Sequence, residues 1–157
     1  MNEIVKYLKT EHELALREMT AIEKMLLRET NVWKVLERLV KLVENLWDHF
    51  NLEKETIYAE LDKLPRKFPL KFSDMEADDW ERIISVARKD IWRAVEYREE
   101  KIKNSAIRSA KTLIEFMKKH FALEEELIFP AMEKLTEEQK RRILCVLTEI
   151  SKVPWGD

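Results

Sequence analysis

Two segments of the chain repeat a pattern of residues that can bind a metal ion. The segment from His49 to Ile57 (HFNLEKETI) matches the segment from His120 to Ile128 (HFALEEELI) at six of nine positions, and an aromatic residue follows each copy. In both copies a glutamate lies four residues after the histidine. On a helix this spacing places the two side chains on one face, one turn apart. Imidazole and carboxylate groups together suit iron, zinc or manganese.

Both histidine–glutamate pairs are predicted to face the interior. Apolar residues flank them at helical spacing, namely Leu46, Phe50 and Ile57 for the first pair and Met117, Phe121 and Ile128 for the second. A glutamate in an apolar interior is costly unless a cation pairs with it, and a metal ion is a common partner. His12, four residues after Leu8, lies on the inner stripe of its own helix. The three histidines of the chain therefore all fall on apolar faces, on three different predicted helices.

A single histidine–glutamate pair at this spacing is ordinarily a surface ion pair worth a few tenths of a kcal/mol. Two copies of the pair within a repeated motif, together with a third inward histidine, favour a metal site instead. The alternatives left open are polar pairs within the core and a site that has decayed.

The elements that position these residues are predicted to be helices. The apolar period is helical nearly everywhere, and a single glycine is too few for a sheet protein of this length. Pro65 and Pro69 bracket a loop, and Asn104 with Ser105 marks a further break. The predicted helices cover residues 3–29, 32–64, 74 to beyond 95, 107–132 and 137–151.

Two helix starts carry capping signals. Asn31 is a suitable N-cap for the second helix. Thr136, with Gln139 three residues further on, has the spacing of a capping box at the start of the last helix.

The predicted fold class is all-α, an antiparallel up-down-up-down four-helix bundle with a short additional C-terminal helix. No linker rich in Gly, Ser or Pro divides the chain. We therefore predict one domain over residues 1–157, with the core bundle at about 4–135 and the C-terminal helix at about 137–151.

Composition excludes several classes of function. The net charge of −2 arises from 29 basic and 31 acidic residues that are finely interleaved, so no basic stripe predicts nucleic-acid binding. No apolar run has membrane-spanning length, and the N-terminus lacks the pattern of a signal peptide. Cys145 is the only cysteine, which predicts a reducing, cytoplasmic location. The abundance of Lys, Arg and Glu is thermophile-like.

The motifs resemble those of the hemerythrin-like family, the HHE cation-binding domain, over roughly residues 4–135. The resemblance rests on Glu11 and His12, on the first repeated pair, and on the run from His120 to Pro130 (HFALEEELIFP), which is the most specific part. It implies an antiparallel four-helix bundle that holds iron, most often two ions, and binds or senses dioxygen or another small ligand. The implied ligands are His12, His49, Glu53, His120 and Glu124.

One position departs from the family pattern. Members normally carry a histidine near the start of the third helix, and Trp80 occupies that place here. A di-iron site with an altered ligand is the preferred hypothesis, ahead of a mononuclear site and of a site that has lost its metal. The candidate substitutes on the third helix are Asp78, Asp79, Glu81 and Tyr97.

The leading functional hypothesis is a metal-binding or sensing module and not an enzyme. No glutamate lies three residues before any histidine, which argues against a ferritin-like oxidase. The alternatives are an iron-dependent peroxidase, a nitric-oxide-handling enzyme, and a degenerate bundle that acts as a structural or protein-interaction module. A sensor without an output domain requires a separate protein partner.

Overall fold

The described part of the chain is helical throughout. The computed structural model describes residues 3–28, 31–63 and 77–150, apart from the side chains of residues 77, 78 and 148–150, and no strand occurs within these ranges. The all-α prediction is confirmed to that extent. In chain order the elements are α1 (Glu3–Leu27), α2 (Val32–Glu53), the π-helical turn η1 (Lys54–Tyr58), α3 (Ala59–Leu61), α4 (Ala77–Tyr97), α5 (Glu100–Met132) and α6 (Glu137–Ile150).

The two predicted capping interactions are confirmed. The side-chain oxygen of Asn31 accepts a hydrogen bond of 3.1 Å from the backbone N–H of Trp33. The backbone N–H of Thr136 donates to Oε1 of Gln139 at 2.9 Å, and the N–H of Gln139 donates to the Thr136 hydroxyl at 3.1 Å. These bonds satisfy backbone donors that have no partner inside a helix, and so they fix where α2 and α6 begin.

The predicted break at Asn104 and Ser105 is wrong, because both residues lie inside α5. The chain turns instead at Arg98, whose φ of 53° is in the left-handed region. The Arg98 guanidinium lies 5.5 Å from the centre of the Trp33 ring and pairs with Glu37 at 3.2 Å. These contacts offset the cost of a left-handed residue other than glycine, whereas asparagine and serine are only weakly unfavourable within a helix.

The second predicted helix is not uniform. The α-helical pattern of α2 gives way to the π turn η1 at Lys54, and α3 follows as one short turn. The predicted loop at Pro65 and Pro69 lies outside the described residues. The same holds for Pro154 and Gly156, where the ordered chain was predicted to end.

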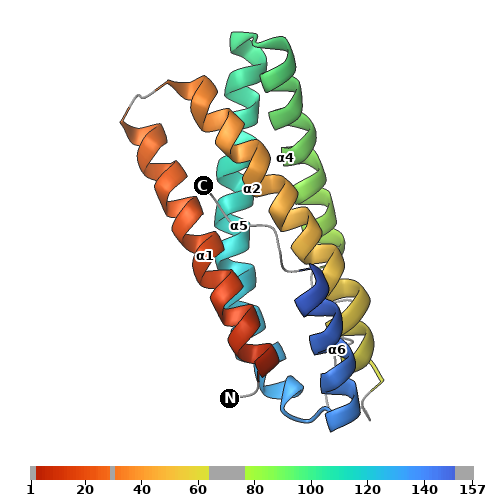
Figure 1. Ribbon diagram of the computed structural model, residues 1–157. Coiled ribbons are helices and arrows are strands. Elements are labelled where there is room, and N and C mark those ends of the chain that lie inside the picture. Colours follow the sequence, from red (N-terminus) through yellow and green to blue (C-terminus); the bar gives the residue numbers. More distant parts are fainter. Residues whose placement is uncertain (1–2, 29–30, 64–76, 151–157) are drawn as a thin grey trace.

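The four long helices pack against one another, and α6 lies against one end of them (Figure 1). Helix α1 contacts α2 and α5, α2 contacts α4, and α4 contacts α5 along much of its length. Helix α6 contacts α1 and η1. Each long helix turns an apolar stripe inward, as the sequence pattern predicts.

The buried apolar residues form two separate clusters. The larger cluster contains Ala15 of α1, Phe50 of α2 and Phe121 of α5, and the smaller cluster contains Leu8 of α1 and Ile128 of α5. Along α1, along α2 into η1, and along α5, the buried residues belong first to one cluster and then to the other. The predicted metal-binding residues lie where this change occurs. The interior is therefore two apolar regions with a polar layer between them.

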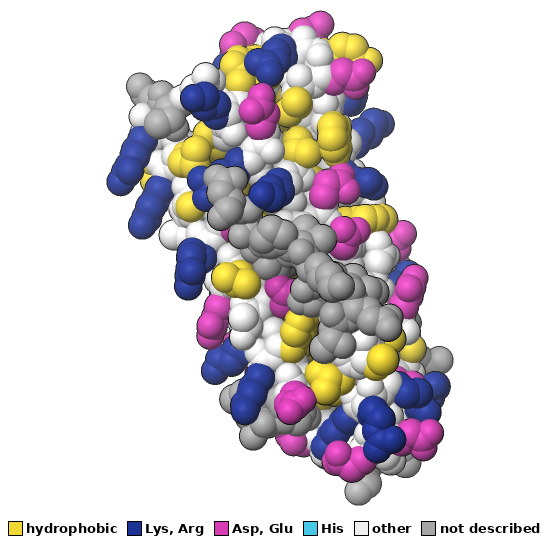
Figure 2. Space-filling model, viewed as in Figure 1, with side chains coloured by type: hydrophobic (Ala, Val, Ile, Leu, Met, Phe, Trp, Pro, Cys, Tyr) yellow, Lys and Arg dark blue, Asp and Glu magenta, His cyan; other side chains and the backbone are white. Residues whose placement is uncertain are grey.

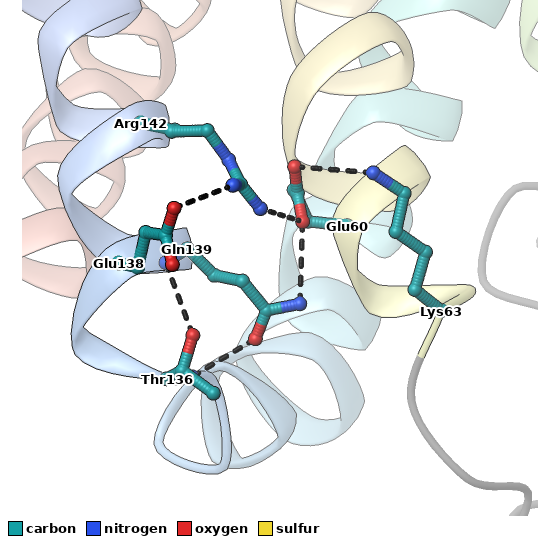
Figure 3. A network of polar contacts seen from close by, with 6 residues as sticks. All are labelled: Glu60, Lys63, Thr136, Glu138, Gln139 and Arg142. Carbon is teal, nitrogen blue, oxygen red and sulfur yellow. Dashed lines mark hydrogen bonds and ion pairs between the residues drawn. The ribbon is translucent and has the colours of Figure 1, made fainter.

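Helix α6 is held in place by a buried carboxylate (Figure 3). Glu60 of α3 accepts hydrogen bonds from Gln139 and from Arg142 of α6, both at 3.2 Å, and one of 3.4 Å from Lys63. Ile143 of α6 is buried in the smaller apolar cluster. Polar and apolar contacts thus fix α6 against the end of the molecule near η1.

Basic and acidic side chains both occur along the whole length of the face seen in Figure 2. Among the helices described, none combines the length and the apolar character needed to cross a membrane.

Replacing the buried carboxylate is expected to loosen α6. The substitution Glu60→Gln removes charged hydrogen bonds to Arg142 and Lys63, and it should lower the free energy of unfolding by about 1 kcal/mol. Urea denaturation followed by circular dichroism measures this change. The matched control Glu138→Gln removes an exposed pair with the same arginine, and it should have little effect. Equal losses for the two variants would contradict the role assigned to Glu60.

Candidate metal centre

The structure brings together the five residues that the sequence singles out. His12 comes from α1, His49 and Glu53 from α2, and His120 and Glu124 from α5. All five are buried, and none exposes more than the 6% of His49. Their potential donor atoms form two groups of three, His12–His49–Glu53 and Glu53–His120–Glu124, within each of which all donor atoms lie within 4.8 Å of one another. Glu53 belongs to both groups.

Glu124 lies between two imidazole rings. Its Oε1 atom is 2.9 Å from Nε2 of His120 and 3.7 Å from Nε2 of His12. Nε2 of His49 is in direct contact with Oε1 of Glu53. At the edge of the cluster the partly exposed Glu125 approaches Nδ1 of His12 at 3.6 Å. The carboxylates and imidazoles therefore face one another, as ligands of a shared ion would.

Aromatic rings enclose the cluster. Phe121 stacks on His12 with ring centres 4.1 Å apart, and the rings of Trp80 and His120 meet edge to face with centres 4.0 Å apart. The Phe50 ring packs against Trp80 with centres 4.3 Å apart. Such rings restrict the orientation of the imidazoles and exclude water, which strengthens electrostatic interactions inside the site.

The donor set fits a transition-metal ion. His12 is fully buried, yet neither of its ring nitrogens has a hydrogen-bond partner in the described part of the chain. Leaving such a group unsatisfied costs about 1–3 kcal/mol, and a metal ion would use the nitrogen lone pair. Three imidazoles with two carboxylates suit iron, zinc or manganese and not calcium or magnesium, which prefer oxygen ligands alone.

Burial and charge set the protonation of His12 and Glu124. Burial lowers the pKa of His12 to about 4, even though the Glu124 carboxylate acts in the opposite direction. His12 is therefore neutral at pH 7, which is the form that binds metal. Burial, together with the negative charge of Glu53, raises the pKa of Glu124 to about 7. Two carboxylates in one dry site cannot both ionise freely without a cation.

The other pair is held by mutual attraction. Burial alone would lower the pKa of His49, but the nearby carboxylates of Glu53, Glu124 and Glu11 together outweigh burial and raise this pKa to about 9. Burial would raise the pKa of Glu53, but the charges of His49 and His120 and the contact with Glu124 together lower it to about 2. Without metal, the two side chains form a buried ion pair.

Three of the four proposed helix-3 substitutes, Asp79, Glu81 and Tyr97, lie away from the cluster. Asp79 is exposed and pairs with Arg82 at 3.6 Å, and Glu81 is also exposed. Tyr97 is 60% exposed at the opposite end of α4 from Trp80. The side chain of the remaining candidate, Asp78, lies outside the described part. Trp80 itself is fully buried against His120, in the place where a third-helix ligand was expected.

Sequence reasoning missed one polar residue of the cluster, Tyr58. Its side chain is 2% exposed, and its hydroxyl donates a hydrogen bond of 3.0 Å to Oε2 of Glu124. Burial and the charges of Glu124 and Glu53 raise the pKa of Tyr58 well above its ordinary value. The repeat in the sequence could have indicated this residue. Tyr58 follows the first copy of the repeat as Phe129 follows the second, and Tyr58 alone of the two carries a hydroxyl.

Comparison of the chain with protein-family models, with curated proteins and with solved structures finds no match. The geometry and chemistry of the cluster are therefore the basis for assigning a function.

Metal binding is expected to release protons, because the ion competes with protons for the same atoms. At pH 7 His49 carries a proton and Glu124 is partly protonated. The apparent affinity for Zn²⁺ should therefore rise with pH and level off above about 9, where His49 has lost its proton. Calorimetric titration in two buffers of different ionisation enthalpy counts the protons released. An affinity independent of pH would contradict this account.

Proposed function

We propose that this chain is an iron-binding protein of the hemerythrin-like kind, folded as one domain. In this proposal α1, α2, α4 and α5 form an antiparallel up-down-up-down bundle, and α6 is an addition to it. The proposal is supported by the contacts of α1 with α2 and α5, of α2 with α4, and of α4 with α5. It is also supported by the brief connections at residues 28–31 and 98–99, since short connections favour antiparallel neighbours.

The observation that carries the proposal is the sharing of Glu53 between two buried donor groups. His12, His49 and Glu53 would hold one iron ion, and Glu53, His120 and Glu124 would hold the second. A carboxylate has two oxygens and can serve two ions at once. Two cations would also offset the burial of two neighbouring carboxylates, which is otherwise costly.

The proposed activity is the binding or sensing of a small ligand such as dioxygen. When bound, iron supplies an open coordination position and a change between ferrous and ferric states. Trp80 contributes no ligand, so an ion held by Glu53, His120 and Glu124 would have few protein donors. It would keep a coordination position for a small external ligand. The rings of Phe121 and Trp80 keep water away from that position.

A second candidate is a degenerate bundle that acts as a structural or protein-interaction module. Trp80 favours it, because a large ring is packed against His120 in the place expected for a ligand. This candidate leaves unexplained why His12 is buried with both ring nitrogens unsatisfied.

The test is the absorption spectrum of protein loaded with ferrous iron without oxygen, recorded before and after exposure to air. Charge-transfer bands of ferric iron should appear in the near ultraviolet. Their disappearance when dioxygen is removed would support reversible binding, and persistence with consumption of added peroxide or nitric oxide would support an enzyme. An unchanged spectrum would contradict the proposal.

A matched pair of variants locates the spectral change. Glu124→Gln removes a buried carboxylate of the cluster and should abolish the bands, whereas Glu126→Gln alters an exposed neighbour on the same helix and should preserve them. Equal spectra for the two variants would place the iron elsewhere in the chain.

A further inference from the structure

The hydroxyl of Tyr58 reaches the candidate metal centre from an unusual element. Tyr58 is the last residue of the π turn η1, and its hydrogen bond to Glu124 connects this turn to α5. The phenol oxygen acts as the donor in this bond, and Oε2 of Glu124 is the acceptor, at 3.0 Å. Tyr58 is 2% exposed and Glu124 is fully buried, so water does not compete for this hydrogen bond.

The π turn changes the angle between the directions in which Glu53 and Tyr58 point. In an α-helix of about 3.6 residues per turn, a residue five places after Glu53 would point about 140° away from it. A π turn joins residues five apart by hydrogen bonds, so position 58 falls close to position 53 on the same face. Turns of this type are rare and occur frequently at functional sites.

The second copy of the repeat provides an internal comparison. There α5 continues as an α-helix with Pro130 inside it, and Phe129 stands in the position of Tyr58. Phe129 stacks on His12 with ring centres 5.7 Å apart and has no hydroxyl to offer. Both positions therefore reach the site, and the copy with the π turn is the one whose aromatic residue carries a hydroxyl that donates to Glu124.

The two oxygens of Glu124 consequently have different surroundings. Oε2 accepts the hydrogen bond from Tyr58, while Oε1 lies near the imidazoles of His120 and His12. The bond from Tyr58 occupies one lone pair of Oε2 and fixes the rotation of the carboxylate, so Oε1 is the oxygen directed at the imidazoles and at an ion bound with them. Groups that orient metal ligands in this way typically change affinity by about tenfold to a hundredfold.

We propose that Tyr58 is a positioning residue of the metal centre, which fixes Glu124 so that a single carboxylate oxygen faces the ion. This inference rests on the proposed metal-binding function. Tyr58 is not itself a ligand. It stabilises the arrangement of the site, a role that a ligand on the third long helix would otherwise have.

The experiment compares Tyr58→Phe with the wild-type protein, using Co²⁺ alone as the probe. The variant keeps the ring and loses only the hydroxyl. Its affinity for Co²⁺, measured by competition with a chelator, should fall about tenfold to a hundredfold. The visible Co²⁺ spectrum should also change, because Glu124 is free to bind through both oxygens. A purely structural role would lower the stability of the metal-free protein and leave this spectrum unaltered.

The control is Tyr7→Phe, which removes a phenol that donates a hydrogen bond of 2.8 Å to Glu11, outside the donor groups. It should leave affinity and spectrum unchanged. Equal affinities for Tyr58→Phe and the wild type would overturn the proposal for Tyr58 while the metal centre stands. An intense phenolate band in the ferric wild-type protein would overturn it by making Tyr58 a ligand. A wild-type protein that binds no Co²⁺ would overturn the proposed function together with this inference.

Discussion

The rest of the structure depends on the burial of two carboxylates and three imidazoles in a layer between two apolar clusters. Removing an ion from water carries a penalty of several kcal/mol unless a partner restores the lost interactions. Within the layer His49 contacts Glu53 directly, and His120 lies 2.9 Å from Glu124. The ring nitrogens of His12 have no hydrogen-bond partner among the described residues, and the pKa of Glu124 is raised. A cation bound in the layer would offset both costs.

The helices are arranged to meet this constraint. Three of them, α1, α2 and α5, contribute donors at the level where their apolar stripes pass from one cluster to the other. The fourth long helix, α4, contributes Trp80, which closes the layer with an apolar ring. Helix α6 completes the smaller cluster and is fixed by Glu60, two residues after Tyr58. Residues 58–60 therefore contribute both to the contact with α6 and to the candidate metal centre.

Much of this arrangement could be predicted from the sequence, because helical periodicity is a local property. The apolar stripes, the caps at Asn31 and Thr136, and the placement of the histidines on inner faces all follow from spacing alone. The π turn could not be predicted, since it is a departure from that spacing. Tyr58 was assigned no role, although the repeat pairs it with Phe129, which also reaches the site. The turn at Arg98 depends on contacts with residues far away in the sequence. Asp79, Glu81 and Tyr97 share α4 with Trp80 but not its inward face. For Asp79 and Glu81, which are next to Trp80 in the sequence, helical periodicity would have indicated this.

The central claim is that the buried layer is a two-ion metal centre in which Glu53 is shared. The most direct test is the number of iron ions bound per chain, measured by elemental analysis after anaerobic loading and removal of free metal. The account predicts about two irons per chain, because the two donor groups meet at Glu53. A count near one would contradict the shared carboxylate, and a count of zero would contradict the metal centre as a whole.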